Sequence, residues 1–127
     1  MYKEIMIIIV VIVIVMGIDV ISRNYTEEAV AEISSKLNEL KIEILNENLI
    51  ASKDKMKEVM KIWKERYNIL AYYIEHDELE KVETELTRLS ADIDMKEYKH
   101  CINELNTTIF ILNHIKQKEE FDIKSVF

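Results

Sequence analysis

The sequence of 127 residues contains no proline, one glycine and one cysteine. Without glycine and proline, the chain has little material for tight hairpin turns or for glycine-rich phosphate loops, which disfavours an all-β fold and a nucleotide site. A single cysteine excludes a disulfide within the chain. The net charge of −7 at pH 7 argues against nucleic acid as a partner, because a nucleic-acid binder presents a basic face.

A long hydrophobic run stands at the start of the chain. Residues 5–18 carry no charge. As a helix, residues 2–22 would be about 31 Å long, enough to cross the roughly 30 Å hydrocarbon core of a bilayer. We therefore predict that residues 1–22 are a retained membrane anchor. A cleaved secretory signal is the second interpretation, because the run is also of signal-sequence length, and a buried core helix is the third.

Charge near the anchor favours one orientation. Lys3 and the amino terminus lie on a very short tail, so we expect this tail inside and the rest of the chain outside. The anchor and its flanks hold two basic residues, Lys3 and Arg23, and two acidic ones, Glu4 and Asp19. The whole net charge of −7 therefore belongs to the remaining chain, which does not suit a peripheral binder of anionic lipid.

After Arg23, apolar residues recur at spacings of three and four, which is the pattern of amphipathic helices. Asn46 and Asn48 interrupt the pattern and are good N-cap residues. Asp77 and Asp94 each precede a glutamate by three residues, as in a capping box, so we predict them as helix caps. The pattern predicts helices over about 24–45, 48–75, 77–91 and 94–119. Nothing between Ser22 and Glu27 stops the anchor helix from continuing into the first of these.

Connections this short make neighbouring helices antiparallel. The predicted fold is all-α, with an N-terminal transmembrane helix followed by an up-and-down antiparallel four-helix bundle. The bundle covers residues 23–120, and residues 121–127 form an apolar tail that either folds back or docks on a partner. A long coiled-coil rod is the alternative, which the internal cap signals disfavour.

Catalytic and metal-binding patterns are weak in this sequence. It contains no nucleotide loop, nucleophile elbow or HExxH motif. Cys101 follows His100 directly, but adjacent helical residues do not face each other, so an inert buried thiol is expected. His100 and His114 would lie about 21 Å apart along a helix, too far to share a metal ion. His76 belongs to a helix start. We expect no enzyme, no metal and no cofactor.

Two short segments are apolar around the whole helix, residues 69–74 and 109–112. Either neighbouring helices surround them in the bundle centre, or they form a surface for self-association or a partner. The candidate interaction surface consists of five aromatic residues: Trp63, Tyr67, Tyr72, Tyr73 and Phe110. An aromatic ligand site is the alternative, and it would need a cavity near Trp63.

From Trp63 onward, the pattern resembles a bacterial family known as domain of unknown function 4363. The matching features are WKERYNIL from Trp63, HDELE at residues 76–80, LTRLSADI with Leu86 and Leu89, the acidic break at 92–97, and LNHI in the last helix. The likeness covers nearly the whole chain, most clearly residues 48–119. It implies a membrane-anchored or exported helical protein of clostridia and bacilli, with an accessory role and no established activity.

The sequence thus favours an interaction or structural module at the bacterial cell envelope. We expect a single-pass protein of the cytoplasmic membrane, held there by residues 1–22, with its bundle outside. Its partner is a second copy of the chain or another envelope protein. The alternative is an extracytoplasmic ligand-binding or sensor bundle.

Overall fold

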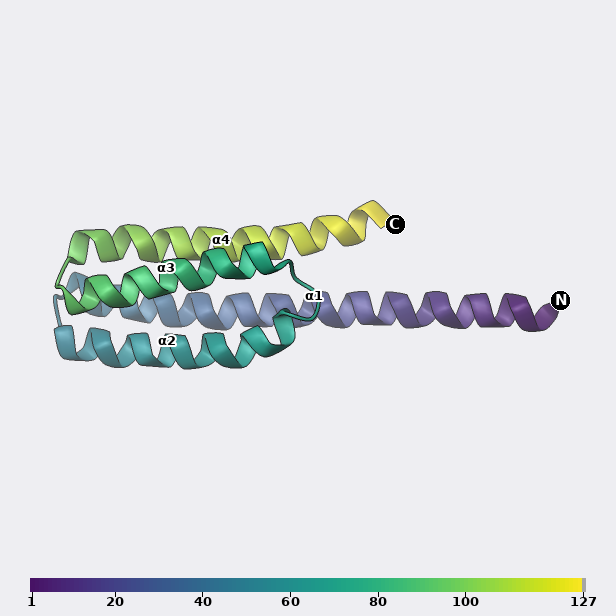
Figure 1. Ribbon diagram of the computed structural model, residues 1–127, viewed down its shortest axis with the longest axis horizontal. Coiled ribbons are helices and arrows are strands. Elements are labelled where there is room, and N and C mark those ends of the chain that lie inside the picture. The colour runs from purple at the N-terminus through teal and green to yellow at the C-terminus, as the bar shows by residue number, and fades with distance from the viewer. Residues whose placement is uncertain (127) are drawn as a thin grey trace.

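The computed structural model describes the backbone of residues 1–126 and the side chains of residues 1–119. This part contains four α-helices and no strand: α1 (Tyr2–Leu45), α2 (Leu49–Leu70), α3 (His76–Asp94) and α4 (Tyr98–Val126). In Figure 1, α2 and α3 lie along the C-terminal half of α1, α4 extends past them, and the N-terminal end of α1 projects alone. The predicted all-α fold is confirmed.

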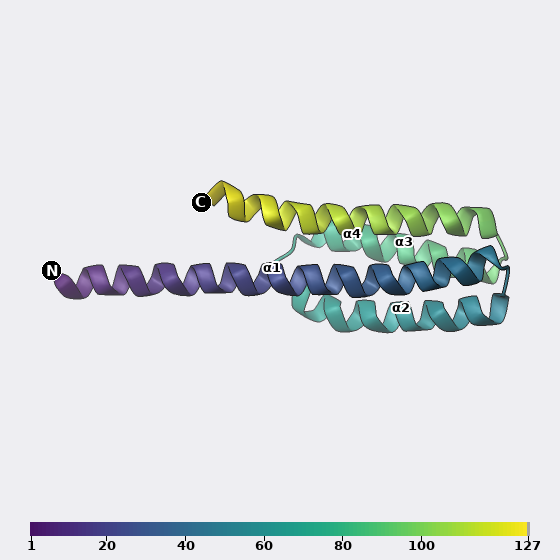
Figure 2. The same ribbon diagram turned by 180° about the vertical axis from the view of Figure 1, so that it is seen from behind.

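The four helices form an antiparallel ring. α1 packs against α2, α2 against α3, α3 against α4, and α4 closes the ring against α1. This is the predicted up-and-down bundle. Seen from behind in Figure 2, α4 runs along α1, and its C-terminal end extends past α2 and α3 toward the exposed half of α1.

α1 is a single helix of 44 residues, about 66 Å long. Its first part is exposed to solvent, and its buried residues begin only at Thr26. No break occurs between Ser22 and Glu27, so the predicted continuation of the N-terminal helix into the bundle is confirmed. α1 is long and apolar enough to cross a membrane, and none of its apolar window is buried. That exposure is incompatible with the third interpretation of residues 1–22, a buried core helix.

The core of the bundle is built from one apolar face of each helix. Burying each leucine or isoleucine side chain contributes about 1.5–3 kcal/mol, so this shared core is what holds the ring together. Trp63 is the largest of these side chains, and its ring packs edge-on against Tyr67 at 5.8 Å between centroids. The best-buried members are Ile33, Leu37, Leu40, Ile44, Val59, Trp63, Leu79, Leu86, Leu89, Ile93, Leu105 and Leu112.

Polar residues make the turn between α1 and α2, as predicted. Asn48 is the N-cap of α2, and its side-chain oxygen accepts a hydrogen bond from the backbone N–H of Ala51 at 3.1 Å. Glu47 has a φ of 55°, which lets the chain reverse within three residues. Asparagine suits this place because its short side chain satisfies a free N–H of the first helical turn.

The turn between α2 and α3 corrects two predictions. α2 ends at Leu70 and not at 75, because the N–H groups of Tyr72 and Tyr73 bond to the carbonyls of Ile69 and Leu70 in a tighter turn. The N-cap of α3 is Glu75, whose carbonyl accepts from the N–H groups of two residues, Glu78 and Leu79. The predicted cap, Asp77, lies inside the first turn, where its charge still favours the helix dipole.

The turn between α3 and α4 corrects a third prediction. Asp94 is the last residue of α3 and not a cap of α4. α3 is longer than predicted because its last turn places Ile93 in the core. The chain reverses at Lys96, with a φ of 60°, and the carbonyl of Glu97 accepts from the N–H of Cys101 at 3.0 Å. α4 therefore begins at Tyr98 and not at 94. It continues to Val126, whereas the side chains of the predicted apolar tail lie outside the described residues.

Candidate interaction surfaces

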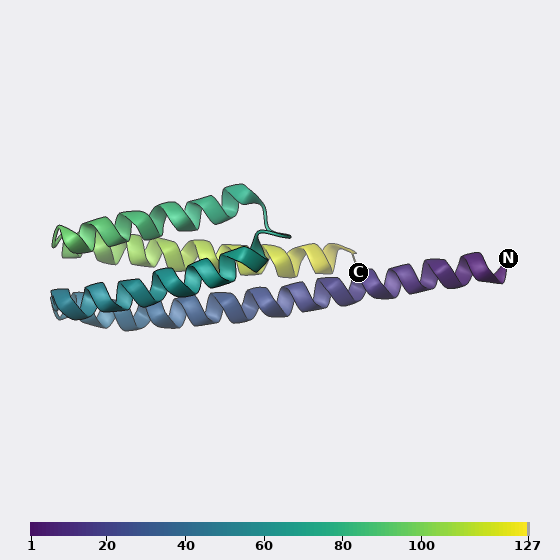
Figure 3. The same cartoon turned by 60° about the horizontal axis from the view of Figure 1, so that its bottom comes forward.

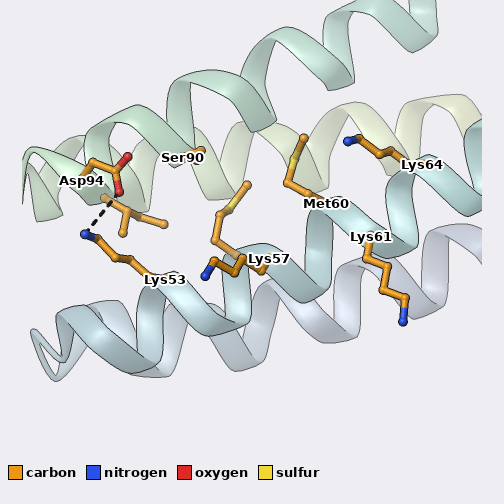
Figure 4. A pocket seen from close by; sticks show the side chains of 9 residues that line it. Lys53, Lys57, Met60, Lys61, Lys64, Ser90 and Asp94 are labelled. Atoms are coloured by element: carbon orange, nitrogen blue, oxygen red, sulfur yellow. Dashed lines mark ion pairs between the residues drawn. The ribbon is translucent and has the colours of Figure 1, made fainter.

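A groove of about 470 Å³ lies between α2 and α3. Its floor is apolar and is made of Met56, Met60 and Ile93. Its rim is polar, and Figure 4 shows the side chains that line it. The rim residues are Lys53, Lys57, Lys61 and Lys64 from α2, and Ser90 and Asp94 from α3.

The arrangement of the helices explains why a groove opens here. Figure 3 shows α3 lying with α4 and α2 lying with α1, as two antiparallel pairs. α2 and α3 pack against each other less extensively than any other neighbouring pair in the ring. Their facing side chains therefore stay partly uncovered, and Met60 is only half-buried.

The two sides of α2 differ in how their charges are compensated. Toward α1, Arg66 forms an ion pair with Glu32, and Lys55 lies 3.4 Å from a carboxylate oxygen of Glu39. The hydrogen bond and the charge of Lys36, together with the charge of Lys55, lower the pKa of Glu39. The cations on this side of α2 are therefore held by carboxylates of α1 and of α2 itself.

Toward α3, the lysines are largely uncompensated. Lys53 lies 3.8 Å from a carboxylate oxygen of Asp94, and a dashed line in Figure 4 marks this ion pair. Lys57, Lys61 and Lys64 form no ion pair within the described part of the chain. A protein of net charge −7 thus carries lysines without ion-pair partners along one apolar groove, although the side chain of Lys61 points away from the groove in Figure 4.

The aromatic residues predicted as one interaction surface are dispersed in the structure. Trp63 is 1% exposed, so its predicted place on a surface is wrong; its position on α2 faces the core. Its indole N–H has no hydrogen-bond partner among the described residues. Tyr67 packs against this ring and is partly buried. Trp63 does not line the groove either, so the groove is not an aromatic ligand cage.

Tyr73 is held to α1 and is not a free surface residue. Its hydroxyl donates to the carbonyl of Ser22 at 3.1 Å and lies 2.7 Å from the hydroxyl oxygen of Thr26. Tyr72 in the same turn is 89% exposed, and Phe110 on α4 is 72% exposed. Segments 69–74 and 109–112 are therefore each divided between a buried and an exposed side, because the neighbouring helices cover only part of them.

The groups considered for chemistry do not converge. Cys101 is fully buried, and this burial raises the pKa of its thiol to about 11, which disfavours the nucleophilic thiolate. His76, His100 and His114 are exposed at separate places on α3 and α4. Among the described residues, no three His, Cys, Asp or Glu side chains are placed to hold a metal ion.

One carboxyl group between α3 and α4 has an unusual environment. Glu104 of α4 is partly buried, and one of its carboxylate oxygens is enclosed without a hydrogen-bond partner. Burial, a hydrogen bond with Asp92 and the negative charges of Asp92 and Glu85 raise the pKa of Glu104 to about 7. The charge of Arg88 opposes this shift only in part. This group lies between two packed helices, so its protonation affects the stability of the bundle.

The fold and its surfaces define a helical-bundle protein with an apolar N-terminal helix suited to a membrane. The chain matches the model of a family described as a domain of unknown function, DUF4363, over residues 20–126, and it belongs to that family. The resemblance seen in the sequence is thereby confirmed. No curated protein and no solved structure matches the chain.

The lysine row was visible in the sequence, although it was not singled out there. Lys53, Lys57, Lys61 and Lys64 follow one another at helical spacings of four, four and three residues. Sequence periodicity places them on one side of α2, but a solvated helix face gives the same pattern. Only the position of α3 shows that this side borders a groove.

Proposed function

We propose that this protein is a single-pass protein of a bacterial cytoplasmic membrane whose helical bundle acts as an interaction module at the cell envelope, without catalysis. The observation that carries this proposal is the continuity of α1. One helix begins as a fully exposed apolar segment and ends in the core of the bundle. Because a helix without a break is stiff, it would hold the bundle at a fixed height and rotation above the bilayer.

The turn between α2 and α3 supports a position close to the membrane surface. The carbonyl of Ser22, at the end of the predicted span, accepts the hydrogen bond from Tyr73. This turn therefore lies beside the point where α1 would leave the hydrocarbon core. A partner embedded in the same membrane could reach the side of the bundle without a long linker.

The distribution of reactive groups supports a function without catalysis. Catalysis by a nucleophile and a base requires both groups in one pocket. Here Cys101 is enclosed in the core, whereas all three histidines are exposed, including its neighbour His100. The exposed surfaces offer apolar and charged contact area instead, in the groove and around Tyr72 and Phe110.

Membrane topology is the first property to measure. An epitope tag after Phe127 should be removed by protease added to intact cells without their walls, and the membrane-bound form should have its full, unprocessed mass. Protection of the tag would place the bundle in the cytoplasm and contradict the proposed orientation. A mass lacking residues 1–22 would identify a cleaved signal sequence and contradict the anchor.

Association is the second property to measure. Tyr72 and Phe110 are exposed, so both can be replaced by serine with little effect on folding. Replacing Tyr73 would instead remove its hydrogen bond to α1. If the bundle associates through these aromatics, Tyr72→Ser/Phe110→Ser should weaken cross-linking in cells at unchanged protein level. Unchanged cross-linking would show that these two side chains are not part of the contact.

A second candidate function is a ligand-binding bundle, and the groove between α2 and α3 is the observation that favours it. Pockets for small molecules are mostly apolar with a few polar groups, as here. The anionic dye anilinonaphthalene sulfonate combines an apolar body with one negative charge. Saturable one-to-one binding of this dye that raises the unfolding temperature of the protein would favour this candidate. Absence of such binding would count against it.

A further inference from the structure

We propose that the groove between α2 and α3 binds an amphipathic helix with an acidic edge, supplied by another membrane protein. This inference deepens the proposed function and rests on it, because it names the partner that the interaction module would hold. Three features of the groove lead to it: an apolar floor, lysines without ion-pair partners among the described residues, and an ion pair across its far end.

The floor suits the apolar stripe of a helix. Met56 and Met60 supply the α2 side of the floor, and Ile93 supplies the α3 side. Methionine is unbranched and adapts its shape, so methionine-lined grooves accept helices of differing sequence. A helix laid into such a groove buries residues spaced by three and four, which is a common mode of peptide recognition.

The lysines define the length and the charge of the occupant. From Lys53 to Lys64 the row spans about 16 Å along α2, or about three helical turns. Neighbouring lysines are about one turn apart, so a parallel or antiparallel helix with acidic residues at the same spacing can face each of them. A compact anion would meet one or two of these lysines and leave the others uncompensated.

The two rims differ, which gives the occupant a preferred orientation. The α2 rim carries Lys57, Lys61 and Lys64 without ion-pair partners among the described residues. The α3 rim carries Ser90 and the acidic Asp94. The acidic edge of a bound helix must therefore lie over α2. Its other edge, beside α3, must be neutral or basic to avoid repulsion.

The ion pair between Lys53 and Asp94 bridges the groove at the end farther from the anchor, near the start of α2. The unpaired lysines follow toward the end of α2 that adjoins the membrane. Lys61 points outward in Figure 4, and a lysine side chain has enough rotatable bonds to turn toward an incoming carboxylate. The open, positive part of the groove is therefore within reach of a helix that continues from a neighbouring transmembrane span.

A synthetic peptide tests the site directly. The full chain is placed in nanodiscs of phosphatidylcholine, with empty nanodiscs as the blank. The probe is a fluorescein-labelled helical peptide of about 18 residues with a leucine stripe and glutamates along one edge. We expect saturable one-to-one binding by fluorescence anisotropy. Binding should weaken as sodium chloride is raised, because salt screens exposed charges.

A matched pair of double variants separates the groove from net charge. Lys57→Gln/Lys64→Gln should raise the Kd for the peptide about tenfold, as expected for the loss of two charge contacts. Lys99→Gln/Lys116→Gln removes the same charge from lysines of α4 that form no ion pair among the described residues, and it should change the Kd less than twofold. Met60→Gln should also weaken binding. Unfolding temperatures of all variants report whether they are folded.

Several results would overturn the inference. One is that the two double variants weaken peptide binding equally. Another is that a peptide of the same composition in scrambled order binds as tightly as the amphipathic peptide. If vesicles containing phosphatidylglycerol bind through Lys57 and Lys64 while the peptide does not, the groove belongs to anionic lipid. None of these results affects the protease test, so the proposed membrane topology is tested independently of the groove.

Discussion

The hydroxyl oxygen of Tyr73 lies 2.7 Å from that of Thr26, and both hydroxyl groups lie within hydrogen-bond distance of the carbonyl oxygen of Ser22. The contact joins the turn between α2 and α3 to the point on α1 where the apolar segment ends. It links residues 47 positions apart in the sequence. It therefore connects this end of the bundle to the apolar part of α1.

We predict that Tyr73→Phe lowers the free energy of unfolding by about 1 kcal/mol, because a partly buried hydrogen bond is lost while the ring is kept. The measurement is denaturant unfolding of the full chain in nanodiscs, followed by the fluorescence of the single tryptophan, Trp63. Tyr72→Phe is the matched control, since that side chain is 89% exposed, and it should leave the unfolding curve unchanged. Equal effects of the two variants would contradict a specific role for Tyr73.

We predict that Trp63→Ala and Phe110→Ala differ strongly although both remove a large aromatic ring. Trp63 is enclosed in the core, so its truncation should cost about 3–5 kcal/mol of stability. Phe110 is 72% exposed on α4, and its truncation should stay within about 0.5 kcal/mol. Helical circular dichroism during thermal unfolding measures both. A small effect of Trp63→Ala would refute its place in the core.

We predict that the protein becomes more stable as the pH falls from 8 to 5. The pKa of Glu104 is about 7 in the folded chain, compared with an ordinary value of 4.5 for a glutamate in the unfolded chain. Between pH 4.5 and pH 7 the folded state therefore binds a proton that the unfolded state releases. The stabilisation from this proton is complete below about pH 4.5 and is lost as the pH rises through 7. Its expected size is on the order of 1 kcal/mol.

The variant Glu104→Gln should remove most of this pH dependence and should stabilise the protein at pH 8, because it removes a buried charge facing Asp92 and Glu85. Glu83→Gln, an exposed carboxyl on α3, is the control and should keep the pH dependence of the parent. Unfolding temperatures between pH 5 and pH 8 decide the point. A parent protein whose stability rises with pH over this range would be inconsistent with the environment of Glu104.

We predict a single narrow distance between spin labels at Val10 and Ile42, two exposed positions on α1, in a background without Cys101. The two positions are separated by about 48 Å along an unbroken helix. Asn24→Pro should broaden this distribution, because proline interrupts the hydrogen bonds of a helix and kinks it. Asn24→Ala is the control. A broad distribution in the parent would show that the apolar N-terminal part of α1 and the bundle move independently.

The apolar patterns of this sequence determined most of the fold. Spacings of three and four placed Leu37, Leu86 and Leu105 on the faces that are buried in the structure, because amphipathicity is a local property of each helix. The absence of a break near Ser22 predicted the continuous α1. Asn48 was recognised as a cap because its role depends only on the next turn of helix.

The tertiary structure decided the exact helix ends, the exposure of individual side chains and the position of the groove. Asp77 and Asp94 have the sequence of caps, yet the burial of Ile93 and the docking of Tyr73 set the ends of the helices instead. Trp63 and Phe110 are both aromatic residues on helices, and only packing buries one and exposes the other. The lysines of α2 border a groove because α3 packs closely with α4 and leaves α2 partly uncovered. Exposure and pairing are relations between distant segments, so one helix's sequence cannot specify them.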